Sequence, residues 1–282
     1  MKKVVIMTDS SAGFSILEQK KYNVVVIPLM ISINSNKSFK DNDEINDTEL
    51  FNFVVTKRAT VKTSQALLGD LEALWDDLLL QYEIIVFLPL AKEISGQYHT
   101  ALMLCKEEKY CGRIILLDTK NTSFILKTMV LATREYLNND GDLNKIQEDI
   151  INPIQQTSDA YIIPGNLQFL AIGGRIPKSI ANIANLLKVK PILQCKDKIT
   201  KVGVTRTLSR ALKNVVMILQ NNHSDRKIKK LYVLLSWCDD KTINLIKKVA
   251  LKYQINNIEF LEMANILKVH LGNNTITLIT VP

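Results

Sequence analysis

Short, continuous apolar runs alternate with amphipathic helical stretches in the first half of this sequence, and this alternation restricts the fold more than any other feature. The apolar runs are Val4–Met7, Ile84–Leu88 and Ile114–Leu117. The clearest helical stretch is Gln65–Tyr82, whose apolar side chains recur with a period near 3.6 residues. Because strands buried on both faces are apolar throughout, the pattern predicts a parallel sheet with helices on both sides.

Further elements complete this first half. The run Val24–Ile33 reads as a strand, and Pro28 within it favours a strand end or edge at that point. We also expect helices at Ser95–Glu108, Phe124–Asn138 and Leu143–Gln156. In the longest helix, the predicted apolar face consists of Leu67, Leu68, Leu71, Leu74, Trp75, Leu78 and Leu79.

The second half is of a different character. A strand is expected at Asp159–Ile163, and the turn Lys196–Lys198 predicts a hairpin between Ile192–Gln194 and Ile199–Val204. Other expected strands are Leu231–Ser236, Ile258–Met263, Lys268–Leu271 and Thr275–Val281, and the expected helices are Leu167–Leu187 (for most of its length), Leu208–Asn221 and Lys241–Tyr253. We therefore predict a mixed sheet and place a domain boundary near residue 157, which gives domains 1–157 and 158–282.

The charge of the chain restricts its partners. The sequence has 36 basic and 28 acidic residues, which gives a formal net charge of +8. The lysines are scattered, and no dense arginine-rich run with interleaved aromatic residues occurs. A nucleic-acid partner is therefore not expected, although a basic chain of this kind leaves room for transient contact with an anionic membrane surface.

Cysteine and histidine usage argues against a metal site. The four cysteines form no CxxC pair, and the three histidines lie far apart. The apolar run at the N-terminus is too short for a signal peptide, and no apolar run reaches membrane-spanning length. These features predict a cytoplasmic protein with reduced thiols.

Known signatures of catalysis are missing from the sequence. We find neither GxxxxGK[ST] nor GxGxxG after a strand, and no GxSxG motif. His99 lies inside an expected helix, and no Ser–His–Asp arrangement can be argued from spacing. Neither a bound cofactor nor an enzymatic activity is therefore predicted.

Polar clusters occur where expected strands or loops meet helix starts. They are Thr8–Ser11, Thr63–Gln65 and the pair Ser95 and Gly96. Ser, Thr and Asp are preferred helix caps, so capping alone explains each cluster. In a parallel sheet, however, such loops gather at the carboxyl ends of the strands, where helix N-termini attract anions. Both interpretations stay open at this point.

Three further positions allow two interpretations each. Gly173 and Gly174 precede Arg175, either as a glycine helix cap with a solvated arginine or as a backbone that lets an arginine bind a carboxylate or phosphate. His270 ends an expected strand before a Gly-Asn-Asn turn. It is either a packed strand-end residue or a hydrogen-bond donor at a ligand site. Arg206, flanked by two threonines, is either solvated or in contact with a partner.

The order of short motifs along the chain suggests a family. The motifs are Thr8–Ala12 (TDSSA), Val26–Leu29 (VIPL), Thr63–Gln65 (TSQ), Ile94–Tyr98 (ISGQY), Leu117–Lys120 (LDTK), Leu167–Ile176 (LxxLxxGGRI), Lys190–Leu193 (KPIL), Arg206–Leu212 (RxxxxAL) and His270–Gly272 (HLG). Over nearly its whole length the chain thus resembles the DegV family of bacterial fatty-acid-binding proteins. It departs from that pattern at Ala66 and Leu67, where Pro-Ser is usual, and at Asn273 and Asn274, where Pro-Gly is usual.

The resemblance implies two α/β domains: an N-terminal Rossmann-like, mostly parallel sheet and a C-terminal mixed domain, with the ligand in the cleft between them. A long-chain fatty acid would extend into an apolar tunnel. Its carboxylate would lie near Thr63 and Ser64, near Ser95 and Gly96, and close to His270. A separate ATP-dependent fatty acid kinase would phosphorylate the bound acid for phospholipid synthesis, and the chain itself would be non-catalytic.

The resemblance also implies a role for two arginines and shows one further departure from the family pattern. Arg175 and Arg206 become candidates for contact with the kinase or with phosphate. A serine that contacts the carboxylate in the family aligns with Lys92 here. Either Lys92 replaces a hydroxyl contact with a charge contact, or it pairs with Glu93 or solvent. The alternatives to the kinase role are a lipid sensor or carrier, and a small-molecule α/β enzyme that uses the same cleft.

Overall fold

The computed structural model describes residues 3–34, 37–174, 189–222 and 228–282. The chain divides into two compact units. The first contains Met1–Leu50, Ala59–Thr157 and Ala264–Ile266, and the second contains Phe51–Arg58, Ser158–Met263 and Leu267–Pro282. Thr157 and Ser158 thus fall in different units, while the division into domains 1–157 and 158–282 stays a prediction.

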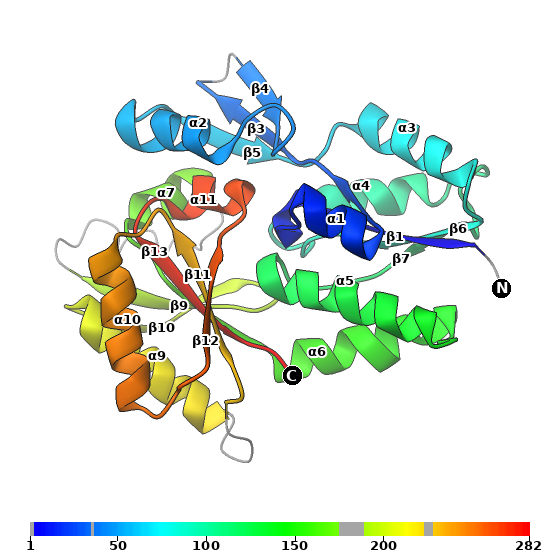
Figure 1. Ribbon diagram of the computed structural model, residues 1–282. Helices are drawn as coiled ribbons and strands as arrows, with labels where there is room; N and C mark the ends of the chain where they lie inside the picture. The colour runs from blue at the N-terminus through cyan, green and yellow to red at the C-terminus, as the bar shows by residue number, and fades with distance from the viewer. Residues whose placement is uncertain (1–2, 35–36, 175–188, 223–227) are drawn as a thin grey trace. The chain divides into compact units, whose positions relative to one another are not determined.

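The first unit is built on a parallel sheet of four strands in the order β2-β1-β6-β7. These strands are β1 (Val4–Asp9), β2 (Val24–Ile27), β6 (Ile84–Leu88) and β7 (Ile114–Leu116). The strand order reverses between β1 and β6. The predicted parallel sheet is confirmed, and its continuous apolar strands are explained by helices on both faces (Figure 1).

The helices of this unit pack on the sheet in two layers. In Figure 1, α3 (Leu68–Leu79) and α4 (Gln97–Leu104) lie on one face, and α5 (Ser123–Asn138) and α6 (Asn152–Thr157) lie on the other. One core cluster joins Met7 and Phe87 of the sheet to Trp75 of α3, which is fully buried. A short helix, α1 (Ile16–Tyr22), connects β1 to β2.

A second, antiparallel sheet of three strands belongs to the same unit, in the order β4-β3-β5. The strands are β3 (Met30–Ile33), β4 (Lys37–Lys40) and β5 (Val61–Ser64), and α2 (Asp47–Phe51) and a π-helix (Asn52–Thr56) connect β4 to β5. The run 24–33 forms two strands instead of one, and the strand end expected at Pro28 is confirmed. The chain leaves the parallel sheet after Ile27, next to Pro28, and re-enters a different sheet at Met30.

Three predicted helices differ in extent from the structure, and one of them, predicted at 95–108, is the shorter α4 (Gln97–Leu104). Helix α3 begins at Leu68 because Leu67 is extended and Ala66 before it donates its N–H to the side chain of Gln97. Leu67 and Leu68 are therefore about half exposed instead of lying on the buried face. The predicted helix 143–156 is also broken, into a 3₁₀ turn (Leu143–Lys145), a π-helix (Gln147–Ile151) and α6.

The second unit contains a mixed sheet of six strands in the order β10-β9-β8-β13-β11-β12. The strands are β8 (Asp159–Ile163), β9 (Lys190–Cys195), β10 (Ile199–Thr205), β11 (Leu231–Ser236), β12 (Ile258–Glu262) and β13 (Thr275–Thr280). Only β11 and β12 pair in parallel; the other neighbours are antiparallel. The predicted mixed sheet and the β9–β10 hairpin are both confirmed.

The core of this unit lies under two helices, α9 (Leu208–Asn222) and α10 (Asp240–Lys252), which cover the same face of the sheet (Figure 1). Ala211, Val215 and Leu219 follow one another at a spacing of four along α9 and are fully buried. They pack against Val233 and Leu278 of the sheet. This is the 3.6-residue periodicity that predicted the helix.

One predicted strand of the second half is a helix. Residues Lys268–Leu271 belong to α11 (Asn265–Leu271), so His270 lies near the end of a helix and not on a strand. Apolar Ile266 and Val269 are buried with the three-residue spacing of a helix, whereas the alternation of Val269, His270 and Leu271 had favoured a strand. The described part of the predicted helix 167–187 is α7 (Leu167–Gly173).

Candidate functional site

The polar residues at the end of β1 form a buried junction with the loop after β6. Thr8 Oγ1 donates a hydrogen bond of 2.7 Å to the carbonyl of Leu88, and the N–H of Leu90 donates to Asp9 Oδ2 at 2.7 Å. Asp9 Oδ1 accepts a bond from the N–H of Ser11. The junction lies where the strand order of the parallel sheet reverses, which is the position where open α/β sheets bind ligands.

The Asp9 side chain is fully buried in this junction. Burial raises the pKa of Asp9 to about 6, although the hydrogen bonds from Ser11 and Leu90 oppose that rise. Both carboxylate oxygens thus hold backbone N–H groups of neighbouring loops. We conclude that Asp9 fixes the loops that follow β1 and β6 and does not itself offer a free ligand contact.

The start of α4 lies beside the end of β5. Gln97 Oε1 accepts the N–H of Ala66 at 2.9 Å, and Gln65 Nε2 donates to Thr100 Oγ1 at 2.6 Å. A Cβ atom at Gly96 would overlap Gln65 Oε1, so the absence of a side chain at Gly96 allows this close approach. Gln97, which motif reading did not single out, therefore joins the TSQ segment to the ISG segment.

Several donors at the start of α4 have no acceptor within the described part of the chain. The N-cap of α4 is Gly96, so the prediction of Ser95 as the cap was wrong by one residue; Ser95 Oγ accepts the N–H of Gln97 at 3.2 Å. The N–H groups of Tyr98 and His99 and the buried Nε2 atom of Gln97 make no hydrogen bond to described residues. A helix start of this kind can accept an anion, because its N–H groups and dipole favour negative charge.

Thr63 and Ser64 lie at the end of β5, immediately before Gln65. Thr63 pairs with Ile31 of β3 and is half-buried, and Ser64 pairs with Met30 and is exposed. The cluster was predicted to lie where a strand or a loop meets a helix start. Strand β5, which the sequence did not predict, extends through Ser64 because of its antiparallel pairing with β3. The proposed contact of Thr63 and Ser64 with a ligand stays a prediction.

Lys92, the departure from the family pattern, forms an ion pair that sequence reading did not foresee. Its Nζ lies 2.8 Å from Asp118 Oδ2 and 5.6 Å from the ring centre of Tyr98. The hydrogen bond to Asp118 raises the pKa of Lys92. The expected pairing with Glu93 or solvent was therefore wrong as to the partner, since the carboxylate that holds Lys92 comes from the end of β7.

The backbone of Asp118 is itself held in place. Its N–H donates to Gln147 Oε1, and its carbonyl accepts bonds from the side-chain amides of Gln147 and Gln155. Asp118 Oδ1 is buried and has no hydrogen-bond partner among the described residues. The ammonium of Lys92 is thus paired with a carboxylate whose backbone is held in place, and this ion pair fixes the ammonium near Tyr98 at the start of α4.

The predicted site residues of the second unit lie on different elements. His270 is half-buried on α11, and its imidazole packs so closely on Gly173 at the end of α7 that a Cβ atom there would overlap Nδ1. Gly174 has the positive φ of 67° expected of a glycine that ends a helix. Arg206 is exposed after β10. Arg175 lies outside the described residues, so its environment stays a prediction.

A further buried carboxyl group, Asp41, was missed because nothing in its sequence context marks it. It is 1% exposed, and no donor of the described residues reaches either oxygen in hydrogen-bonding geometry. Burial raises the pKa of Asp41 to about 6, while Ser10 and the backbone of Ile266 act in the opposite direction. Among the described residues, no group of three His, Cys, Asp or Glu side chains could hold a metal ion.

Comparison with known proteins assigns the family. A family model described as "Uncharacterised protein, DegV family" matches residues 3–282. The chain belongs to the DegV family. A "DegV domain-containing protein" of Staphylococcus aureus is 25% identical over 280 residues and 99% of both chains. Another, of Mycoplasma genitalium, is 27% identical over 268 residues, which cover 92% of this chain and 90% of that protein.

Solved structures of DegV proteins share the fold over the full length. A fatty acid binding DegV family protein from Streptococcus agalactiae aligns with a TM-score of 0.87 at 24% identity, and DegV of Bacillus subtilis, described as a fatty acid binding protein, aligns at 0.85 and 21%. Each alignment covers 100% of this chain and 99% of the other. A stearic acid-binding protein from Eubacterium ventriosum aligns at 0.86, with 19% identity, 100% coverage of this chain and 98% of its own.

No helix in the described ranges is both long and apolar enough to cross a membrane.

Proposed function

We propose that this DegV protein binds a long-chain fatty acid and presents the carboxylate to a separate ATP-dependent fatty acid kinase, which forms the acyl phosphate. One observation carries the fatty-acid-binding part of the proposal, and the kinase part rests on the family resemblance. Over its entire length the chain adopts the fold of three proteins described as binding fatty acids, with TM-scores of 0.85 to 0.87. The proposal includes the acyl tunnel between the two domains that the family resemblance implies.

The start of α4 supports a carboxylate-binding role. The N–H groups of Tyr98 and His99 and the buried amide of Gln97 together offer donors without an acceptor in the described structure. The Gln97 amide is buried, so its unmet donor is costly, and an acceptor from a ligand would stabilise it. We propose that the head group lies here, near Thr63, Ser64, Ser95 and Gly96, with Lys92 as a nearby charge and with His270 as a further donor.

The tail should dominate the affinity. A chain of roughly 15 methylenes contributes about 0.8 kcal/mol for each buried group, or on the order of 12 kcal/mol as an upper bound. That exceeds a charge-assisted hydrogen bond by several-fold. We therefore expect head-group variants to change the orientation and phosphorylation of the acid more than its retention.

Lipid analysis tests the binding proposal directly. Denaturing mass spectrometry of the purified protein should detect a co-purified acyl chain, and delipidated protein should take up added fatty acid. A protein that contains no acyl chain and takes up none would refute the proposal. Adding ATP and a fatty acid kinase then distinguishes a kinase partner from a lipid carrier, because only the former yields acyl phosphate.

A pair of threonine variants tests the head-group position. Thr63→Ala should lower the rate of acyl-phosphate formation while the fatty acid stays bound. The matched control is Thr60→Ala, an exposed threonine just before β5. Equal rates for both variants would remove Thr63 from the site. Arg175→Ala and Arg206→Ala, assayed in the same way, should reduce turnover with lipid retained if these arginines contact the kinase or the phosphate.

A further inference from the structure

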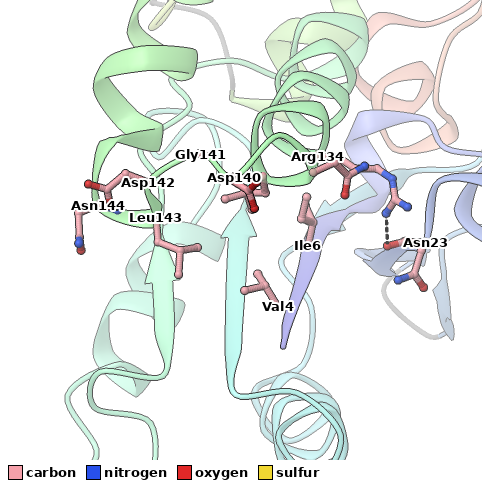
Figure 2. Close-up of a pocket in the computed structure, with 11 residues that line it drawn as sticks. Val4, Ile6, Asn23, Arg134, Asp140, Gly141, Asp142, Leu143 and Asn144 are labelled. Carbon is pink, nitrogen blue, oxygen red and sulfur yellow. Dashed lines mark hydrogen bonds between the residues drawn. The ribbon is translucent and has the colours of Figure 1, made fainter. Parts of the chain in front are cut away.

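A cavity of about 550 Å³ opens in the first unit, away from the junction at Asp9 (Figure 2). Its floor includes Val4 and Ile6, which lie in the first half of β1, whereas Asp9 ends that strand. The cavity is therefore at the amino ends of the parallel strands. Its other lining residues come from the end of α5, the loop that follows and Asn23. Its volume is in the range of small-molecule sites.

Charges of opposite sign lie on two sides of the apolar floor. In Figure 2, Arg134 extends toward Asn23 on one side of Ile6, and Asp140 and Asp142 lie on the other. The only bond of the Arg134 guanidinium to the described residues is a long one, 3.4 Å, from Nη1 to the carbonyl of Asn23. Most of its donors are thus available to a ligand.

The acidic side of the cavity has spare acceptors. The carboxylate of Asp140 makes no hydrogen bond or ion pair within the described structure, and one oxygen of Asp142 caps the N–H of Asn144 at 2.9 Å. The carbonyls of Leu137 and Asn138, in the last turn of α5, also accept no bond from the described residues. A helix C-terminus with nearby carboxylates attracts a cation.

Tyr136 holds this acidic loop in one conformation. Its carbonyl accepts the N–H of Gly141 at 3.0 Å, and its hydroxyl accepts the N–H of Asp142 at 3.1 Å while donating to Asp149 Oδ2 at 2.7 Å. Its ring packs so closely on Gly141 that no Cβ atom would fit there. The acceptors are therefore already in position before any ligand arrives, which lowers the entropic cost of binding.

We propose that this cavity binds a small zwitterion with an apolar group, of which an aliphatic α-amino acid is the simplest example. The ammonium would lie against Asp140 and the carbonyls that end α5, and the carboxylate would meet Arg134. The alkyl group would cover Val4 and Ile6. A fatty acid has no cationic group and would leave the carboxylates of Asp140 and Asp142 without a positive partner. This site is therefore separate from the proposed fatty-acid site and does not depend on it.

A ligand series tests the proposal by ¹H–¹⁵N NMR of the full chain. L-Leucine at millimolar concentration should cause saturable shifts at residues 137–144. Glycine, 3-methylbutylamine and 4-methylpentanoate each lack one of the three features, and each should bind at least about tenfold more weakly, since each loses a contact worth a factor of this size. Absence of saturable shifts with leucine, or equal binding of 4-methylpentanoate, would overturn the proposal.

Charge variants give an independent result. Arg134→Gln and Asp140→Asn should each weaken leucine binding by about tenfold. The controls Arg210→Gln and Asp197→Asn remove exposed charges in the second unit and should leave the affinity unchanged. Asp140 is exposed, so its variant should fold even if the Arg134 variant does not. Leucine binding to Asp140→Asn with wild-type affinity would contradict the assignment.

Discussion

Two buried carboxyl groups of the first unit differ in how the protein compensates their charge. Asp9 accepts two backbone N–H bonds, whereas Asp41 receives none in hydrogen-bonding geometry from the described residues. The pKa of each is raised to about 6 by burial. An ionised, unpaired carboxylate is costly to bury, so Asp41 should weaken the fold at neutral pH.

The Asp41→Asn variant should be more stable than the wild type above pH 6. A carboxyl whose folded pKa is raised stabilises the fold while both states are protonated, and this contribution is lost as pH rises through the folded pKa. A shift of about two units corresponds to roughly 3 kcal/mol, lost between about pH 4 and pH 7. Urea unfolding across this range measures it, with exposed Asp197→Asn of the second unit as the control. Equal pH slopes for Asp41→Asn and wild type would contradict the assignment.

Gly173 has a role that its helix-capping position does not explain. Gly173→Ala should displace the His270 imidazole, because the new Cβ would overlap Nδ1. We expect changed His270 side-chain NMR signals, easily assigned among three histidines, and a loss of about 1–3 kcal/mol in unfolding free energy. Gly69→Ala, where nothing lies within 4 Å of the new atom, is the control. An unchanged His270 signal would show that the two groups are not in contact.

At the scale of elements, replacing two helix and loop glycines with alanine should change the stability of the protein in opposite directions. Gly69 lies in the first turn of α3 with open space around it, so Gly69→Ala should stabilise the protein by about 0.5–1 kcal/mol. Gly141→Ala would overlap the Tyr136 ring and should destabilise it by about 1–3 kcal/mol. Thermal unfolding of both variants measures the contrast. Effects of the same sign would mean that the Tyr136 contact does not hold the loop.

Sequence periodicity predicted the elements that bury a wide apolar face. It failed for elements whose conformation depends on hydrogen bonds to another segment or that are too short to show a period. Helix α9 and strand β6 are where they were expected. Strand β5 was missed because Val61–Ser64 has only a weak apolar alternation, and its partner β3 supplies the hydrogen bonds. In α11, seven residues are too few to separate helical from strand periodicity.

The same reasoning explains what could be known of the candidate site. The polar clusters and Lys92 are visible in the sequence because they interrupt apolar runs or depart from a motif. The partners Gln97 and Asp118 were not expected, because their contacts join segments 31 and 26 residues apart. The bond from Leu90 to Asp9 spans 81 residues. Such pairings follow from strand order, which no local pattern encodes.

At the scale of the whole molecule, the net charge of +8 predicts weak association with anionic membranes. The protein should co-sediment with phosphatidylglycerol-containing vesicles at low ionic strength and be released at high salt, because the Debye length falls from about 30 Å at 0.01 M to about 3 Å at 1 M. Neutral phosphatidylcholine vesicles are the control. Salt-independent binding would indicate insertion of an apolar surface instead.

The division of the chain into units has a consequence for its synthesis. Ala264–Ile266 belong to the first unit, although the residues on either side belong to the second. Domains usually fold as they emerge from the ribosome, N-terminal part first. Here the first unit cannot acquire its last three residues until nearly the whole polypeptide has been translated. Cutting the gene after codon 157 would accordingly leave both products incomplete.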